Sequence, residues 1–340
     1  MTHRTCTSHR TFRIAAHAIC LAVVFQLGLN TVLADDDSVG THENWVTATA
    51  IHGNLLYTAG GQSLQYRPGD VIVWDLTTGK VTKKLEGHDS NVWAIAVSPD
   101  GTKAVSTGYN GKTIVWDTAA GTALATLEKH KGWTRAVDFT PDGTHFATGG
   151  EDGSVVIWKS DDHSEVKTIK AHESAVYDVT FSPDGKTLAT ASVDKTVRLL
   201  NWGAAEGHET AKLEGHEDAV WSVVFAPDGS WLASGGADRR VKLWNAAGEA
   251  QGELVGHGDW ISDLAVSADG ATLFVSDLGR SVKVWSMAEK KATSEFSGFM
   301  GSVWNVTAAE KHLVFGTHKG VRIWDVAGKK EAFFVPKEAK

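Results

Sequence analysis

Three stretches of the chain each hold a histidine, a hydroxyl residue and an aspartate at one fixed spacing. These are the residue types of a nucleophilic catalytic triad. The sets are His130, Thr148 and Asp152, then His172, Thr190 and Asp194, then His216, Ser234 and Asp238. An enzyme of this kind needs one triad in one cleft, whereas here the set recurs along the chain. Recurrence favours a structural role, in which buried polar groups satisfy one another by hydrogen bonds.

Signals for metal or nucleotide binding are poor. The sequence has no His-Glu-x-x-His or Cys-x-x-Cys pattern, and its acids at 35–37 and 161–162 lack the spacing of a calcium loop. The glycine-rich stretch 147–153 has no lysine at the place that a phosphate loop requires. We therefore expect neither a metal nor a cofactor.

The triads lie within units that repeat about every 40 residues. The closing positions, spaced 39 to 44 residues apart, are Trp74, Trp116, Trp158, Leu200, Trp244, Trp285 and Trp324. The opening positions are His42, His88, His130, His172, His216, His257 and Phe299. Within a unit, short runs rich in valine and aromatic residues are separated by turns such as Ser-Pro-Asp-Gly, which predicts β-strands. Units of this length are typical of four-stranded propeller blades.

The sequence resembles the WD-repeat β-propeller family. Trp-Asp closes three units, Gly-His opens three, and the resemblance covers residues 42–335 in seven copies. It implies an all-β, seven-bladed propeller of four-stranded antiparallel blades. The blades begin near 42, 88, 130, 172, 216, 257 and 299. The outermost strands are expected at 80–86, 121–128, 164–170, 208–214, 250–255, 290–296 and 329–335.

In this family the histidine, the hydroxyl residue and the acid form a hydrogen-bonded tetrad with the closing tryptophan. The resemblance therefore implies that Trp158 and Trp244 complete two of the three sets. It also implies a further tetrad in the second blade, made of His88, Ser106, Asn110 and Trp116. In the sixth blade Asp277 stands two positions from the expected place, and the seventh blade has Phe299 instead of histidine.

Ring closure is expected to differ from that of most relatives, in which the N-terminus supplies the outer strand of the last blade. Here only residues 35–41 lie between the predicted leader and the first opening position. We expect 329–335 to supply that strand instead, and the first and last blades to join only by side packing.

The tryptophans are the most informative residues for function. Of the 14, six close a repeat and six more lie three or five positions after an opening position. The candidate partner-binding set is Trp45, Trp93, Tyr109, Trp133, Arg135, Tyr177, Trp221, Trp260 and Trp304. By resemblance these residues lie on the narrow face, at the rim of the central channel, where the family commonly binds peptides.

Tryptophan and arginine are favoured interface anchors, so we expect partly exposed rings that bind a partner. Arg135 adds a donor suited to a carboxylate of that partner. The alternative is that the rings cap the core between the blades, because aromatic side chains bury large areas.

The first 34 residues are typical of a secretory signal peptide. Three arginines precede a mostly apolar run at 14–29, and a Val-Leu-Ala site at 32–34 comes just before three aspartates. Cleavage after Ala34 removes both cysteines, three arginines and no acid, which lowers the formal net charge from −8 to −11. The alternative is an uncleaved membrane anchor, since 14–34 is just long enough to span a bilayer.

We therefore predict an exported protein, periplasmic or secreted, with a single propeller domain over 35–340 that binds a partner and is not an enzyme. The expected partner is a protein or peptide, bound by one copy of the chain within a complex. A carbohydrate stacked on the same tryptophans is the alternative, and a propeller enzyme with catalysis in the channel is a third possibility. The acidic balance disfavours nucleic acid, and no membrane segment is left after cleavage.

Overall fold

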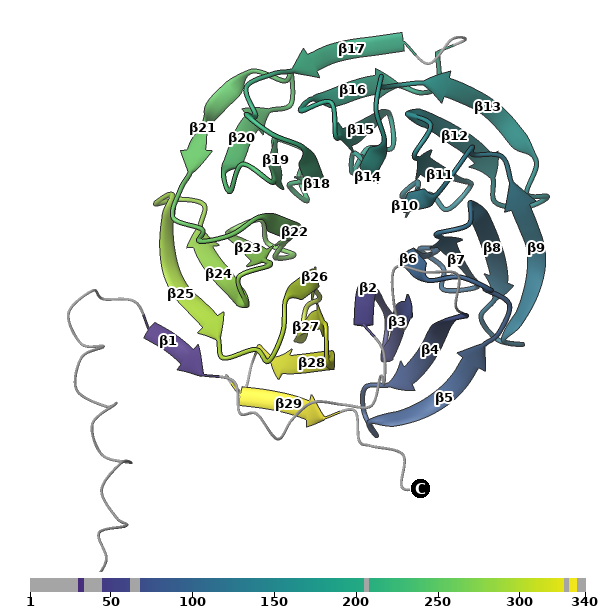
Figure 1. Cartoon of the computed structure of the whole chain (residues 1–340), viewed down its shortest axis with the longest axis horizontal. Helices are drawn as coiled ribbons and strands as arrows, with labels where there is room; N and C mark the ends of the chain where they lie inside the picture. Colours follow the sequence, from purple (N-terminus) through teal and green to yellow (C-terminus); the bar gives the residue numbers. More distant parts are fainter. Residues whose placement is uncertain (1–29, 34–44, 62–67, 205–207, 327–329, 335–340) are drawn as a thin grey trace, which may run out of the picture.

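Seven β-sheets surround a central axis like the blades of a propeller (Figure 1). The computed structural model describes residues 30–33, 45–61, 68–204, 208–326 and 330–334, and all regular structure within them is β-strand. Every blade has four antiparallel strands that follow one another in chain order from the axis outwards. This confirms the predicted all-β, seven-bladed propeller.

The strands are described by their place in the blade. The inner strands are β2 (Trp45–His52), β6 (Val92–Val97), β10 (Thr134–Phe139), β14 (Val176–Phe181), β18 (Val220–Phe225), β22 (Ile261–Val266) and β26 (Val303–Ala308). The second strands are β3 (Leu55–Gly61), β7 (Lys103–Gly108), β11 (His145–Gly150), β15 (Thr187–Ser192), β19 (Trp231–Gly236), β23 (Thr272–Asp277) and β27 (His312–Thr317).

The two outer layers complete each blade. The third strands are β4 (Gly69–Asp75), β8 (Lys112–Asp117), β12 (Ser154–Lys159), β16 (Val197–Asn201), β20 (Val241–Asn245), β24 (Ser281–Ser286) and β28 (Gly320–Asp325). The outer strands are β5 (Lys80–Leu85), β9 (Thr122–Glu128), β13 (Glu165–Lys170), β17 (His208–Leu213), β21 (Ala250–Leu254), β25 (Lys291–Ser297) and β29 (Lys330–Phe334). The outer strands agree with the predicted ranges to within one residue at either end.

The turn chemistry explains why the inner and second strands pair in register. In the fifth blade Asp228 accepts a hydrogen bond from the backbone N–H of Ser230 at 2.9 Å, and Gly229 has a φ of 71°. Glycine adopts this left-handed conformation without steric cost, so the Pro-Asp-Gly sequence fixes a tight connection. At the other end of β19, a Cβ on Gly236 would lie 2.0 Å from the carbonyl oxygen of Ala219. Only glycine therefore allows the inner strand to approach there.

The hydrophobic core lies between the blades. The described residues form seven buried clusters, one at each junction of neighbouring blades. At the junction of the first two blades, for example, Tyr57 and Val73 pack with Ile114 and Trp116. Burial of apolar area at these junctions holds the ring together and leaves the axis to polar and aromatic residues.

The C-terminal strand β29 pairs with β28 and completes the seventh blade, as predicted. Residues 35–41, which bear on the same prediction, lie outside the described residues. Among the described residues the first and last blades join by side packing, through an apolar cluster that includes Val46, Trp74 and Ile323 and through side-chain hydrogen bonds. The hydroxyl oxygens of Thr49 and Thr307 are 2.8 Å apart, and Thr307 also donates to the carbonyl oxygen of Thr49 at 3.0 Å. The inner strands run close enough at this junction for their polar side chains to bond.

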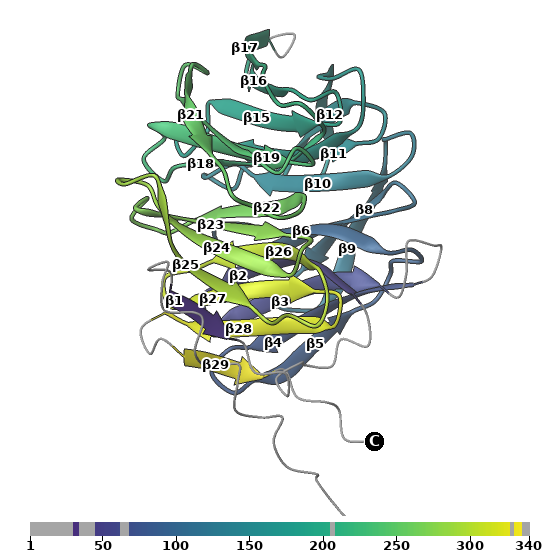
Figure 2. The same ribbon diagram turned by 60° about the vertical axis from the view of Figure 1, so that its left-hand side comes forward.

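One strand lies within the predicted leader. β1 (Asn30–Leu33) pairs in parallel with β25 and adds a fifth strand to the sheet of the sixth blade (Figures 1 and 2). This pairing belongs to the full-length chain, and cleavage after Ala34 would remove it. Among the described residues, no helix has the length and apolar character needed to cross a membrane.

Candidate binding site at the mouth of the axial channel

The fifth blade shows what the repeated triads do. His216 Nδ1 lies 2.7 Å from Asp238 Oδ2 and its Nε2 lies 2.8 Å from Ser234 Oγ, to which Trp244 Nε1 donates at 2.9 Å. The side chains of His216 and Asp238 are only 0% and 2% exposed. Burial opposes ionisation, but the interactions with His216 and the backbone N–H groups of Arg240 and Glu217 together lower the pKa of Asp238. No substrate can reach this histidine, so the tetrad holds the blade together.

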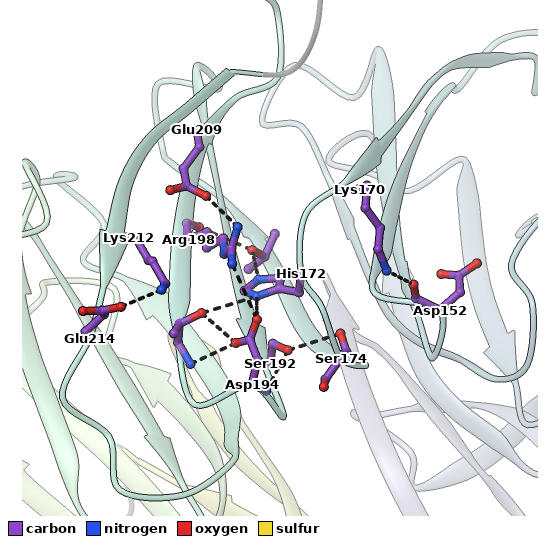
Figure 3. A network of polar contacts seen from close by, with 12 residues as sticks. Asp152, Lys170, His172, Ser174, Ser192, Asp194, Arg198, Glu209, Lys212 and Glu214 are labelled. Atoms are coloured by element: carbon purple, nitrogen blue, oxygen red, sulfur yellow. Dashed lines mark hydrogen bonds and ion pairs between the residues drawn. The ribbon is translucent and has the colours of Figure 1, made fainter.

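The third blade repeats this arrangement. His130 bonds Asp152 at 3.2 Å and Thr148 at 2.9 Å, and Trp158 Nε1 donates to the same threonine hydroxyl at 3.0 Å. Lys170, on the outer strand, donates to the backbone carbonyl of Asp152 (Figure 3). The tetrad is thereby linked to the outer edge of its own blade.

The fourth blade lacks the tryptophan but keeps the rest. His172 Nδ1 is 2.8 Å from Asp194 Oδ2, and its Nε2 is 2.7 Å from Thr190 Oγ1. Leu200, at the position of the tryptophan, is buried in the core shared with the third blade. Arg198 adds a charge partner, with its guanidinium 3.8 Å from the Asp194 carboxylate (Figure 3).

The second blade departs from the prediction, because Asn110 does not complete its tetrad. His88 and Trp116 both bond Ser106, at 2.7 Å and 2.8 Å, but Asn110 donates its amide to Asp89 instead. A neutral amide attracts imidazole less than a carboxylate does, and the neighbouring aspartate is the stronger acceptor. His88 Nδ1 has no hydrogen-bond partner among the described residues, and burial lowers its pKa to about 4.

The sixth and seventh blades use substitutes. Asp277, although displaced in sequence, reaches His257 Nδ1 at 3.1 Å, and Trp285 donates directly to His257 Nε2 at 3.4 Å. In the seventh blade the guanidinium of Arg322 lies 5.2 Å from the centre of the Phe299 ring, so a cation–π contact stands where the histidine would be.

The residue five places after each opening position sits in a β-bulge of the inner strand. Each inner strand shifts its register at that residue, and a bulge redirects the side chain. The seven residues are Thr47, Trp93, Arg135, Tyr177, Trp221, Ser262 and Trp304. All seven line one cavity of about 110 Å³, so the bulges of all seven blades converge on the axis.

The remaining candidate residues lie nearer the mouth of the channel. Trp45, Trp133 and Trp260 stand two places earlier in their repeats, at or just before the start of an inner strand, and Tyr109 follows the second strand of the second blade. Because the blades are antiparallel, these loops lie on one face. Trp260 is 45% exposed, whereas Trp93 is 8% exposed, so the expectation that all the rings are partly exposed is wrong for Trp93.

Six of the rings form a continuous chain of contacts, which we call the aromatic arc. The centroid separations are 6.3 Å for Trp93 and Tyr109, 5.9 Å for Tyr109 and Trp133, 6.2 Å for Trp133 and Tyr177, 5.9 Å for Tyr177 and Trp221, and 5.4 Å for Trp221 and Trp260. The arc crosses five consecutive blades. Trp45 and Trp304 stack on each other at 5.7 Å and make a separate pair.

Arg135 is enclosed by the arc. Its guanidinium carbon lies 4.6 Å from the ring centre of Trp93, 4.0 Å from that of Tyr177 and 5.6 Å from that of Trp221. Burial lowers the pKa of Arg135, but a guanidinium titrates so far above neutrality that it stays charged. The arrangement is an aromatic pocket that already holds a cation.

Three partly buried carboxylates on the inner strands were not identified from the sequence. Asp138 accepts the backbone N–H of Phe181 at 2.8 Å, and Asp178 accepts that of Val223 at 2.9 Å. Asp263 likewise accepts from the seventh blade, at the backbone N–H of residue 306, at 3.0 Å. Each of these bonds joins neighbouring blades. The sequence signal was a lone acid within a short strand that is otherwise largely apolar or weakly polar.

Burial raises the pKa of Asp138 and of Asp263 to about 6, and it raises the pKa of Asp178 as well. Among the described residues, no three histidine, cysteine, aspartate or glutamate side chains gather closely enough to hold a metal ion.

The comparisons with known proteins agree with this architecture. Five segments match the family model described as "WD domain, G-beta repeat", at 79–117, 121–159, 163–201, 207–245 and 248–286, together more than half of the chain. Each segment runs from the outer strand of one blade to the third strand of the next. A similar protein is the small ribosomal subunit protein RACK1y of Oryza sativa subsp. japonica, which is 36% identical over 83 residues. That match covers 24% of this chain and 24% of the relative's length.

Proposed function

Because the chain belongs to the WD-repeat family, whose propellers are protein-interaction scaffolds, we propose that it binds a protein or peptide segment. The binding surface is the mouth of the channel that carries the aromatic arc. The chain acts as a scaffold and not as an enzyme, since its triads are buried structural tetrads.

The observation that carries this proposal is the continuity of the arc. A ring that only capped the core would need to cover just the one junction between two blades at which it lies. Here six rings contact one another across five blades, and they end at Trp260, which is 45% exposed. Large aromatic side chains are seldom left in water without a use. An extended peptide laid across this face would meet a row of rigid apolar anchors.

The same rings suit a carbohydrate, because sugar rings also stack on tryptophan. The test is to screen the exported protein against a displayed random peptide library and against a glycan array. The double variant Trp133→Ala with Trp260→Ala should lose the retained ligands. Trp231→Ala, which removes a half-buried tryptophan at the opposite end of its blade, should keep them. If the protein retains glycans but no peptides, its ligand is a carbohydrate and not a peptide.

Export is part of the proposal. It is supported by the apolar run and the Val-Leu-Ala site ahead of three aspartates. N-terminal sequencing of the protein recovered outside the cytoplasm should begin at Asp35. An intact Met1 in the membrane fraction would contradict this and favour an anchored protein. The exported protein is proposed to be a single chain that joins a complex, which light scattering with and without its captured partner would test.

A further inference from the structure

Arg135 is a half-buried cation that makes no ion pair among the described residues. Three aromatic rings surround its guanidinium, and the charge of Asp178 acts on it only from beyond ion-pair distance. Aromatic faces stabilise the charge, but they accept few of the five N–H donors of a guanidinium. The fork of donors therefore borders the channel cavity with hydrogen-bonding capacity to spare.

A second donor, on a residue that lines the same cavity, is also without an acceptor among the described residues. Trp93 is nine-tenths buried, and its indole Nε1 has no hydrogen-bond partner among the described residues. Trp304 lines the cavity too, and its indole Nε1 also has no hydrogen-bond partner among the described residues. A buried N–H without an acceptor costs roughly 1–3 kcal/mol, so such groups point to a missing acceptor.

The two acids that line this cavity do not fill that role. Asp178 accepts a backbone N–H of the fifth blade, and Asp263 accepts from Ser222 and Asn305 as well as from the seventh-blade backbone. Their oxygens serve the junctions between blades. The cavity is left with a surplus of donors around Arg135.

On the basis of the proposed function, we propose that Arg135 and the indole N–H of Trp93 receive a carboxylate of the bound peptide. The carboxylate belongs to an acidic side chain or to a C-terminus that enters the channel mouth while the rest of the peptide lies on the aromatic arc. A guanidinium fork binds a carboxylate through two parallel hydrogen bonds. The surrounding rings exclude water, which strengthens the pair.

The test uses the isotope-labelled exported protein and follows its tryptophan Nε1–H signals by NMR. The probes are N-acetylglutamate N-methylamide, which offers only a side-chain carboxylate, and N-acetylglycine, which offers only a terminal one. The control probe is the uncharged N-acetylglutamine N-methylamide. At least one carboxylate should shift the Trp93 signal in a saturable way, and the stronger of the two identifies the source. Equal shifts with the glutamine probe would overturn the proposal.

Variants distinguish the effect of the guanidinium on binding from its effect on folding. Arg135→Met should weaken carboxylate binding by about tenfold to a hundredfold, the range for a lost charged hydrogen bond. Arg239→Met, which removes an exposed arginine from the turn between β19 and β20, should have no effect. If Arg135→Met fails to fold, Arg135→Lys keeps the charge but loses the fork and should still weaken binding about tenfold. Unchanged binding in both Arg135 variants would refute the site.

The outcomes distinguish this site from the proposed function. Library peptides that bind without any carboxylate, and equally well to Arg135→Met, would overturn the carboxylate site and keep the scaffold function. A specific carboxylate shift at Trp93 with no retained peptide would keep the site and remove the peptide as its ligand.

Discussion

Thr49 of the first blade and Thr307 of the last blade bring their hydroxyl oxygens to 2.8 Å, and this contact helps to close the ring. Similar polar contacts join other inner strands, such as Ser222 to Asp263 at 2.9 Å between the fifth and sixth blades. Polar bonds near the axis therefore supplement the apolar clusters between the blades.

The bond at the closing junction makes a stability prediction. Thr307→Val should lower the free energy of unfolding by about 0.5–1.5 kcal/mol, because it removes the hydrogen bonds of the Thr307 hydroxyl to Thr49 across the junction, while Thr49 and Asn305 still bond each other. Thr293→Val, which alters an exposed threonine on β25, is the matched control. Denaturant unfolding of both variants measures the difference. Equal stability of the two variants would mean that apolar packing alone closes the ring.

The buried tetrads make a second prediction. Asp238→Ala should destabilise the protein by about 1–3 kcal/mol at neutral pH, while Asp218→Ala, in an exposed loop of the same repeat, should not. The folded state lowers the pKa of Asp238, so its contribution is full above the ordinary pKa of 3.8 and is lost as the pH falls. The difference in the free energy of unfolding between Asp238→Ala and the wild type should therefore become smaller in acid. A constant gap would show that the carboxylate charge is not involved.

The third prediction concerns His88 of the second blade, whose Nδ1 has no hydrogen-bond partner among the described residues. Burial lowers the pKa of His88 from 6.5 to about 4, so the folded state resists protonation and stability falls as the pH drops below about 6.5. Asn110→Asp should place a carboxylate beside the imidazole, as in the third, fourth and fifth blades, and raise the His88 pKa. NMR titration of the histidine signals tests this. An unchanged titration would show that the new carboxylate does not reach His88 Nδ1.

The carboxylate of Asp138 makes a fourth prediction, of opposite sign. Burial raises its pKa from 3.8 to about 6, so the folded state keeps a proton that the unfolded chain releases. The free energy of unfolding should therefore fall as the pH rises from about 4 to about 6. Asp138→Asn should flatten that slope in unfolding curves measured across this window. A slope as steep as that of the wild type would exclude Asp138 as its source.

Repetition explains what could be predicted from the sequence. Features that recur in register, such as the closing tryptophans and the set His216, Ser234 and Asp238, are visible as a pattern before any contact is known. Features that occur once are not. Thr49 and Thr307 are ordinary residues until the ring brings them together. Asn110 matched the pattern of an acid, but the competing acceptor Asp89 decided its orientation.

The channel illustrates the same limit. The aromatic residues could be predicted because they recur at two fixed positions, but how far each ring is buried depends on its neighbours from other blades. Trp93 and Trp221 both lie in a bulge, yet only Trp93 is buried. The cage around Arg135 draws rings from three blades, and no spacing within one repeat shows such an arrangement.

The central claim is that the aromatic arc binds a partner, and calorimetric titration of a library-selected peptide tests it most directly. Trp133→Ala with Trp260→Ala should weaken binding by more than about 2 kcal/mol, the scale of an interface hot spot. These positions avoid Trp93, whose burial would mix stability with affinity. Thermal stability should change little, and Trp231→Ala should bind like the wild type. Unchanged affinity with a large loss of stability would contradict the claim and show that the rings cap the core.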